Sequence, residues 1–198
     1  MDFLYFDTGV MYRAVTLAGL KAGILASDEK RITELAFEIS IDVRPPSRMD
    51  GRQYDVIVNG EDVTWELRSE NVDANVSEVS AYSGVRQAMT ERQREIGRRG
   101  EVIMVGRDIG TVVLPEADLK LYLDATVEAR AERRYEERLA RGEVVEFEEI
   151  LESMRARDRI DSSRDLAPLQ PAEDAVIIDS TELSIEEALE RALELIEG

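Results

Sequence analysis

The feature that most constrains the fold is a run of four apolar residues, Val102 to Val105, that ends at Gly106 and is followed by Arg107 and Asp108. A short apolar run bounded by glycine is typical of a strand buried in a parallel sheet. Ligands of open α/β sheets usually bind at the carboxyl ends of such strands, so we expect Arg107 and Asp108 to face a crevice. Arginine there suits a planar anion such as phosphate. A structural Arg–Asp pair that closes the loop is an equally good alternative.

Other segments repeat the pattern of a short apolar run followed by residues with helical spacing. The runs cover residues 3–6, 119–125 and 175–180. Such alternation predicts an α/β protein with a parallel sheet. Residues 41–66 differ, because two strand patterns and the Asn59-Gly60 turn indicate an antiparallel hairpin. We therefore expect a core domain, residues 1–40 and 67–198, with a small β insertion at 41–66.

The final segment predicts a strand followed by an amphipathic helix. Ser184 and Glu187 have the spacing of a capping box at the start of this helix. Its apolar side is expected to be buried. That side consists of Ile185, Leu189, Ala192 and Ile196.

Composition narrows the chemistry. The 198 residues contain neither Cys nor His, which excludes thiol nucleophiles, the usual zinc sites and Ser–His–Asp triads. The net charge of −18 disfavours a nucleic-acid surface, and no apolar run approaches the ~20 residues of a membrane span. We therefore expect a cytoplasmic protein. Only three of its 25 basic residues are lysine, so the others are arginine. Arginine is the side chain that a phosphate clamp requires.

Several polar residues are candidates for ligand binding, and for each of them a purely structural role is an alternative explanation. Thr8 precedes a predicted helix, where a plain N-cap is the favoured alternative, and Arg13 lies one turn later. Arg86 lies at the beginning of a helix, where a cation is unfavourable unless an anion compensates it. A cationic stripe follows the helix after Thr126, and solvated ion pairs with neighbouring glutamates explain it equally well. The stripe comprises Arg130, Arg133, Arg134 and Arg138.

A second group of charged residues shares one face of the next helix. Arg157, Asp161 and Arg164 are offset by four and seven residues. Such a face suits a ligand with phosphate and hydroxyl groups. Taken alone, a surface ion pair worth ~0.3–0.5 kcal/mol is the favoured explanation.

Four segments taken together resemble the bacterial cytidylate kinases, which transfer the γ-phosphoryl group of ATP to CMP or dCMP. The segments are Asp7–Arg13, Asn59–Thr64, Val105–Val113 and Arg157–Arg164, the last continuing into Ala167-Pro168-Leu169. The likeness runs in order from about Leu4 to the end of the chain. It implies a P-loop nucleoside monophosphate kinase fold, with the insertion at 41–66 as part of the monophosphate-binding domain and a lid at about residues 130–160.

The resemblance also implies a role for each candidate residue. The phosphate of CMP would be held by the catalytic arginines Arg13, Arg107 and Arg164. The cytosine edge would be read by Thr8, Arg86 and Asp108. The ribose hydroxyls would be contacted by Ser77, Arg157 and Asp161. The ATP phosphates would be covered by Arg130, Arg133 and Arg134. ATP and Mg²⁺ are the implied phosphoryl donor and cofactor, no protein metal ligand is implied, and we expect a monomer whose partners are these nucleotides.

Two departures from the family pattern bear on activity. Many relatives carry an acidic residue where this chain has Val105. The family also begins with a central strand and a glycine-rich phosphate loop, whereas no G-x-x-x-x-G-K-[ST] segment occurs in these 198 residues. We therefore expect a truncated kinase with little activity. The alternatives are a non-catalytic CMP-binding remnant and a kinase for another base. A protein-interaction module is disfavoured because it leaves the arginine motifs unexplained, and the preference between CMP and dCMP stays open.

Overall fold

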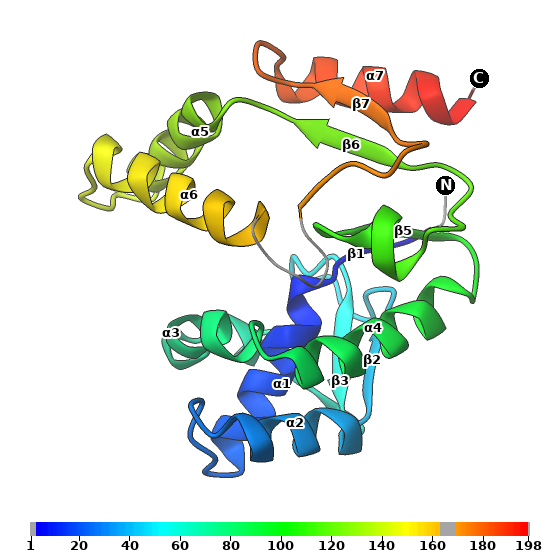
Figure 1. Cartoon of the computed structure of the whole chain (residues 1–198), viewed down its shortest axis with the longest axis vertical. Coiled ribbons are helices and arrows are strands. Elements are labelled where there is room, and N and C mark those ends of the chain that lie inside the picture. The colour runs from blue at the N-terminus through cyan, green and yellow to red at the C-terminus, as the bar shows by residue number, and fades with distance from the viewer. Residues whose placement is uncertain (1–2, 163–168, 198) are drawn as a thin grey trace. The chain divides into compact units, whose positions relative to one another are not determined.

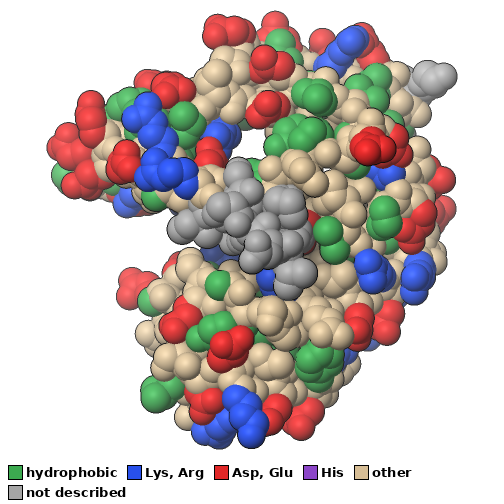
Figure 2. All heavy atoms as spheres, in the orientation of Figure 1, with side chains coloured by type: hydrophobic (Ala, Val, Ile, Leu, Met, Phe, Trp, Pro, Cys, Tyr) green, Lys and Arg blue, Asp and Glu red, His purple; other side chains and the backbone are tan. Residues whose placement is uncertain are grey.

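The computed structural model describes residues 3–162 and 169–197, which belong to two compact units, Met1–Ile109 and Gly110–Gly198. The predicted α/β architecture is confirmed, because both units combine a two-stranded parallel sheet with helices (Figure 1). Acidic side chains are spread over the face of the molecule drawn in Figure 2, as the negative net charge predicts. None of the helices in the described ranges is long and apolar enough to cross a membrane.

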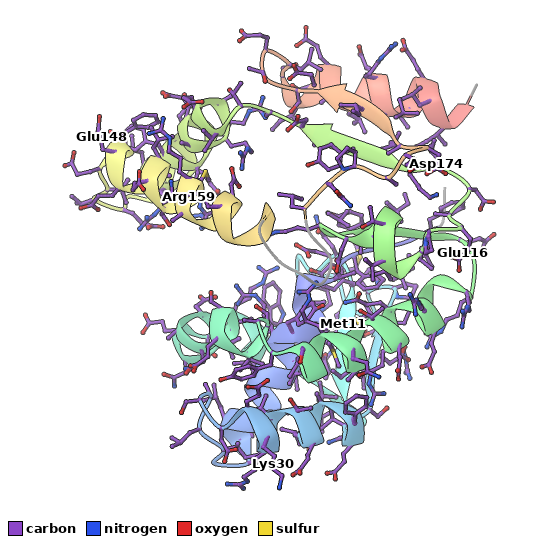
Figure 3. The ribbon with its side chains drawn as sticks, viewed as in Figure 1. Met11, Lys30, Glu116, Glu148, Arg159 and Asp174 are labelled. Atoms are coloured by element: carbon purple, nitrogen blue, oxygen red, sulfur yellow. The ribbon has the colours of Figure 1, made fainter. Side chains whose placement is uncertain are left out.

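The first unit is built around the parallel pair of β1 (Leu4–Asp7) and β5 (Val102–Val105). Its helices are α1 (Gly9–Lys21), α2 (Glu29–Glu38), α3 (Glu70–Val79), α4 (Ser83–Gly97) and the short 3₁₀ helix η1 (Glu66–Arg68). Helix α1 packs against both α2 and α3, and α2 packs against α4. Figure 3 shows Met11, which is fully buried, on α1, and Lys30, which is exposed, on α2.

The β insertion forms the antiparallel sheet that the sequence predicts. Its strands are β2 (Ile41–Arg44), β3 (Asp55–Val58) and the short β4 (Glu61–Asp62). Between β3 and β4, Asn59 and Gly60 have φ values of 50° and 86°, which a two-residue hairpin turn of this type requires. The inward side chains Val43 and Val56 are fully buried, so this sheet shares the core of the first unit.

The second unit contains the parallel pair β6 (Leu121–Asp124) and β7 (Val176–Asp179), with helices α5 (Val127–Ala140), α6 (Phe147–Ser162) and α7 (Ile185–Glu197). A single π-helical turn, η2 (Ile109–Val113), links the units along the chain. Two helices of this unit begin with side-chain caps, and the predicted capping box at Ser184 and Glu187 is confirmed. The Thr126 hydroxyl accepts a hydrogen bond from the Ala129 amide, and Ser184 and Glu187 exchange the two bonds of a capping box.

Burial was predicted wrongly at several apolar positions. Ile103 and Val105 of β5 are 41% and 43% exposed, and Ile185 and Leu189 of α7 are more exposed still. For α7, the reason lies in the width of the two-stranded β6–β7 sheet. Two strands spaced ~4.8 Å apart cannot cover the apolar side of a helix that is ~10–12 Å across. A strand pattern predicts which residues share a face, but not how many neighbours cover that face.

Candidate functional site

The carboxyl ends of β1 and β5 bring two motif segments together. Asp7 lies opposite Val105 in the parallel register, so the chain leaves both strands at the same edge. The amide and the hydroxyl of Thr8 both donate to the Val105 carbonyl oxygen, at 2.9 and 3.1 Å. Thr8 occupies the N-cap position of α1, yet its side chain makes no capping bond. The N-cap explanation of this hydroxyl was therefore wrong, because the hydroxyl is used to join β1 to β5.

Gly106 is required by close packing at this edge. A Cβ atom at Gly106 would lie 2.5 Å from Thr8 Oγ1 and 2.8 Å from Ile109 Cδ1. Both distances are shorter than a carbon atom tolerates. The glycine of the Gly-Arg-Asp motif thus lets the chain after β5 pass directly against Thr8.

Arg86 and Asp108 form a largely buried ion pair beside this edge. Arg86 Nη2 lies 2.6 Å from Asp108 Oδ2, and the two side chains are 14% and 10% exposed. The Arg86 guanidinium also lies 5.6 Å from the centre of the Tyr12 ring. The anion that compensates a cation at the start of α4 is therefore the Asp108 carboxylate. A guanidinium and a carboxylate held side by side can donate to and accept from the edge of a planar heterocycle.

Arg13 is held by two neighbouring elements. Its Nη1 atom donates to the Leu67 carbonyl oxygen of η1 at 2.9 Å and to Asp73 Oδ1 of α3 at 2.6 Å. Ser77 is exposed one turn beyond Asp73, on the same side of α3. Arg13 keeps about a third of its side chain exposed, which leaves it accessible to a ligand.

Tyr54 is a partly buried residue of the first unit whose hydroxyl is influenced by charges of both signs. Burial raises the pKa of the Tyr54 hydroxyl; the nearby Asp7 carboxylate raises it further, while Arg68 and Arg13 lower it. Tyr54 therefore lies within electrostatic range of both the β1 edge and Arg13. Arg107 is half-buried between Gly106 and Asp108 at the end of β5.

In the second unit, all three candidate ATP ligands pair with protein groups, and two of them reach groups outside their own helix. Arg130 makes a bidentate pair with Asp158 of α6, at 2.6 and 3.1 Å. Arg133 donates to the Ser180 hydroxyl and to the carbonyl oxygens of Ser180 and Leu183, which follow β7. Within the described residues, Arg134 pairs with Glu137 of its own helix, and both side chains are exposed. No cluster of three or more acidic side chains suited to a metal ion occurs within the described ranges.

The comparison with known proteins agrees with the motifs. The family model described as cytidylate kinase matches residues 1–198. The chain belongs to the cytidylate kinase family. It is 46% identical to a cytidylate kinase of Herpetosiphon aurantiacus, over 98% of this chain and 83% of the relative. It is 50% identical to one of Chloroflexus aggregans, over 90% and 76%, and 43% identical to one of Bacillus subtilis, over 99% and 86%.

The family assignment confirms the resemblance and makes the chain a member of a family of nucleoside monophosphate kinases. Not every cytidylate kinase motif can be followed in the structure. Arg157 and Asp161 belong to α6, but their side chains lie outside the described residues, and so does the whole of Arg164. The predicted meeting of Arg13, Arg107 and Arg164 on one phosphate therefore stays a prediction.

Sequence reasoning missed two side chains at this candidate site. Tyr12, under the Arg86 guanidinium, stands next to Arg13 within the first motif, and an aromatic residue beside a candidate arginine was the available signal. Asp73, which binds Arg13 from 60 positions away, has no local signal at all.

Proposed function

We propose that this protein binds CMP or dCMP as phosphoryl acceptor and transfers to it the γ-phosphoryl group of ATP, giving CDP or dCDP. The observation that carries the proposal is the Arg86–Asp108 pair, largely buried beside Thr8 at the carboxyl ends of β1 and β5. A buried donor and acceptor pair of this kind suits a nucleobase edge.

The chemistry of the bases explains the preference for cytosine. Cytosine presents an amino group where uracil presents a carbonyl oxygen. The Asp108 carboxylate accepts a hydrogen bond from the amino group, whereas it would repel the carbonyl oxygen. Arg86 donates to the ring nitrogen and the carbonyl oxygen on the same edge, and Thr8 contributes its hydroxyl.

The remaining residues have the roles that the motifs imply. Arg13, Arg107 and Arg164 hold the acceptor phosphate, and Ser77, Arg157 and Asp161 contact the ribose. Phosphoryl transfer requires mainly the positioning of two anions and the neutralisation of their charge, so arginines suffice for these roles. Among the three arginines proposed to bind ATP, Arg134 has to give up one exposed ion pair, with Glu137, before it can bind a phosphate. Arg130 and Arg133 must first leave Asp158 and the carbonyl groups after β7.

Mg²⁺ is the cofactor that the reaction class implies, and enzymes of this class usually hold it through one or two carboxylates together with the phosphates of the nucleotide. The described residues include no cluster of three or more acidic side chains suited to a metal ion, and the sequence has no G-x-x-x-x-G-K-[ST] segment. We assign no step to the metal. The proposal therefore includes that these 198 residues bind CMP but transfer phosphoryl groups slowly, as a cytoplasmic monomer without nucleic-acid partners.

Calorimetric titration with CMP, dCMP, UMP and AMP tests the acceptor. CMP is expected to bind at least tenfold more tightly than UMP, because one charge-assisted hydrogen bond is worth ~1.5–3 kcal/mol. Asp108→Asn should remove most of this preference. Tighter binding of UMP or AMP would favour a kinase for another base, and no binding of any monophosphate would overturn the proposal.

A coupled assay of ADP formation from ATP and CMP tests the transfer itself. We expect turnover far below the ~1–100 s⁻¹ of typical kinases. Turnover within that range would contradict the expected impairment. CMP binding with no turnover at any ATP concentration would favour the non-catalytic remnant.

A further inference from the structure

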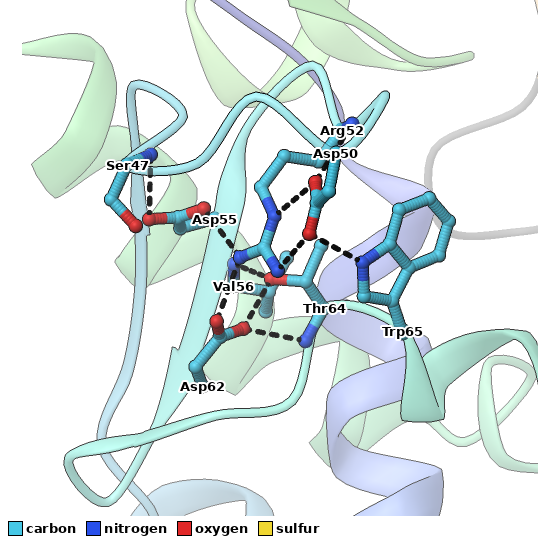
Figure 4. A network of polar contacts seen from close by, with 8 residues as sticks. All are labelled: Ser47, Asp50, Arg52, Asp55, Val56, Asp62, Thr64 and Trp65. Atoms are coloured by element: carbon cyan, nitrogen blue, oxygen red, sulfur yellow. Dashed lines mark hydrogen bonds and ion pairs between the residues drawn. The ribbon is translucent and has the colours of Figure 1, made fainter.

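The β insertion encloses a buried arginine that the proposed reaction does not use. Arg52 keeps only 2% of its side chain exposed and is surrounded by three aspartates (Figure 4). Its Nε and Nη2 atoms bind Asp50 at 2.8 Å, and its Nη1 atom binds Asp55 at 2.8 Å and Asp62 at 2.7 Å. We call Asp50, Arg52, Asp55 and Asp62 the Arg52 cluster.

The Arg52 cluster joins three segments of the insertion. Asp50 belongs to the loop after β2, Asp55 begins β3, and Asp62 ends β4. Since strands β3 and β4 already form a hairpin, the contribution of Arg52 is to fix the long loop against that hairpin. Asp55 adds a bond from the Ser47 amide at 3.1 Å, which fixes the same loop at a second point.

The charges of the cluster are held ionised by these contacts. Hydrogen bonds from Thr64 and then Arg52 lower the pKa of Asp62 to about 2. Hydrogen bonds from Arg52 and then Trp65 hold the pKa of Asp50 well below its usual value. Burial would raise the pKa of Asp55, but the bonds from Ser47 and Arg52 outweigh it and leave the pKa lowered. The cluster therefore stays charged at neutral pH.

Two members of the cluster also hold the chain that follows β4. Asp62 Oδ1 accepts bonds from the amide and the hydroxyl of Thr64, at 3.0 and 2.6 Å. Asp50 Oδ2 accepts a bond from Trp65 Nε1 at 3.0 Å (Figure 4). Thr64 and Trp65 are the last two residues before η1, so the cluster fixes where η1 begins.

Helix η1 presents the carbonyl oxygen that holds Arg13. The Leu67 amide donates to the Val63 carbonyl oxygen at 3.2 Å, and the Leu67 carbonyl oxygen accepts from Arg13 Nη1 at 2.9 Å. Asp73 holds the same Nη1 atom from α3. One of the two groups that orient Arg13 is thus placed by the turn that the Arg52 cluster anchors.

We propose that Arg52 is a positioning residue for Arg13: through Asp50, Asp62 and Trp65 it fixes η1, and the Leu67 carbonyl oxygen then holds Arg13 toward the acceptor phosphate. The inference rests on the proposed function, in which Arg13 binds the phosphate of CMP. A positioning role can be distinguished from a purely stabilising one. Loss of Arg52 should weaken binding of the phosphate group of CMP and leave binding of the nucleoside part unchanged.

Binding of CMP and of cytidine to the full chain tests this distinction by calorimetry. Arg52→Lys keeps the charge but removes the fork that reaches three aspartates. Trp65→Phe keeps an aromatic ring but removes the bond to Asp50. Arg44→Lys is the matched control, since Arg44 lies in the same insertion and pairs with Asp42 at the surface. The two test variants are expected to lower the ratio of CMP affinity to cytidine affinity about tenfold. This is the loss expected when the charge-assisted hydrogen bond between Arg13 and the phosphate is weakened.

A double variant shows whether the effect passes through Arg13. In an Arg13→Lys background, Trp65→Phe should have no further effect on CMP affinity, because residues that act as a unit are not additive. An unchanged CMP to cytidine ratio in folded Trp65→Phe, or additive losses in the double variant, would overturn the inference. If Arg52→Lys does not fold, the Trp65→Phe result decides.

A second readout needs no ligand and so keeps this inference separate from the proposed function. The ¹⁵N NMR signal of the Arg13 side chain should shift in Trp65→Phe and stay in place in Arg44→Lys. If wild-type chain binds no CMP, the proposed function fails, while the NMR comparison still tests whether the cluster orients Arg13. An Arg13 signal unmoved by Trp65→Phe would contradict the inference.

Discussion

Gly106 shows how one residue of a motif is fixed by its neighbour. Its backbone angle is not the reason, because Gly106 does not have the left-handed φ found at Gly60 and Gly142. The reason is Thr8 Oγ1, which stands 2.5 Å from where a Cβ would be. Since the Thr8 hydroxyl also binds the Val105 carbonyl oxygen, the two residues act as one packing unit that joins β1 to the Gly-Arg-Asp motif.

Gly106→Ala is therefore expected to destabilise the first unit by ~1–3 kcal/mol, the usual cost of inserting a methyl group into close packing. Urea unfolding, followed by the fluorescence of the single tryptophan, measures the change. Thr8→Ala removes the nearer obstacle, so the double variant should lose less than the two single losses added together. Equal stability of Gly106→Ala and wild type would show that the chain after β5 moves aside freely.

At the scale of elements, two neighbouring arginines of α5 make different kinds of contact. Arg133 reaches the carbonyl groups that follow β7 and so ties α5 to the turn before α7. Within the described residues, Arg134 pairs with Glu137, one turn along its own helix. Both belong to the cationic stripe, and the spacing of that stripe does not distinguish a tie between elements from a solvated ion pair.

Replacing each arginine by alanine measures this difference. Arg133→Ala should destabilise the second unit by ~1–2 kcal/mol, because charge-assisted bonds to carbonyl groups are lost from a partly exposed site. Arg134→Ala should change stability by less than ~0.5 kcal/mol, as is usual for an exposed pair. Thermal unfolding followed by circular dichroism compares the two variants, and equal losses would contradict the assignment.

The Arg52 cluster predicts how the β insertion responds to acid. The pKa of Asp62 is about 2 in the folded chain and 3.8 ordinarily. As the pH falls, the Asp62 carboxylate is therefore protonated in the unfolded chain before it is protonated in the folded chain, which favours unfolding. This stabilising contribution is present above pH ~4 and is lost as the pH falls toward 2. Asp62→Asn should therefore be less stable at pH 7 and lose less stability between pH 5 and pH 2.5.

Urea unfolding at several pH values gives the free energy of unfolding of each variant, and hence the slope of stability against pH. Glu61→Gln is the control, because Glu61 precedes Asp62 on β4 but lies outside the cluster. Identical slopes for Asp62→Asn and wild type would mean that the Asp62 carboxyl contributes no acid dependence.

How far the sequence predicts an element depends on how local its cause is. The Asn59-Gly60 hairpin and the Ser184–Glu187 capping box were predicted correctly, because each is decided within a few residues. The Arg52 cluster was not predicted, because charges in a loop with prolines and glycine normally indicate a solvated surface. The exposed sides of β5 and α7 were predicted as buried, since burial depends on partners far away in the chain.

The candidate site follows the same rule. The Gly-Arg-Asp motif and the unfavourable position of Arg86 at a helix start pointed to Asp108 and Arg86 separately. Their pairing joins residues 22 positions apart, and only the folded chain brings it about. The groups that orient Arg13, Leu67 and Asp73, lie further still and could not be inferred from spacing.

At the scale of the whole molecule, the net charge repels the anionic ligand that we propose for the local site. The chain carries 43 acidic and 25 basic residues, and CMP is itself an anion. The arginines of the site act over a few ångströms, where salt screens little. The charge of −18 acts at long range, where the Debye length decides its reach: ~30 Å at 0.01 M salt and ~8 Å at 0.15 M. Encounter and binding should therefore depend on salt in different ways.

The rate of CMP association should rise as salt increases from ~0.01 to ~0.15 M, because screening removes the long-range repulsion before it weakens the contacts with arginine. Proteins with basic nucleotide sites and positive net charge behave in the opposite way. Stopped-flow fluorescence of Trp65, next to η1, measures the rate constant, and uncharged cytidine is the control whose rate should not change. A CMP rate that falls with salt would mean that the site arginines already dominate the field at the distance of encounter, and that the acidic surface has no part in selecting ligands.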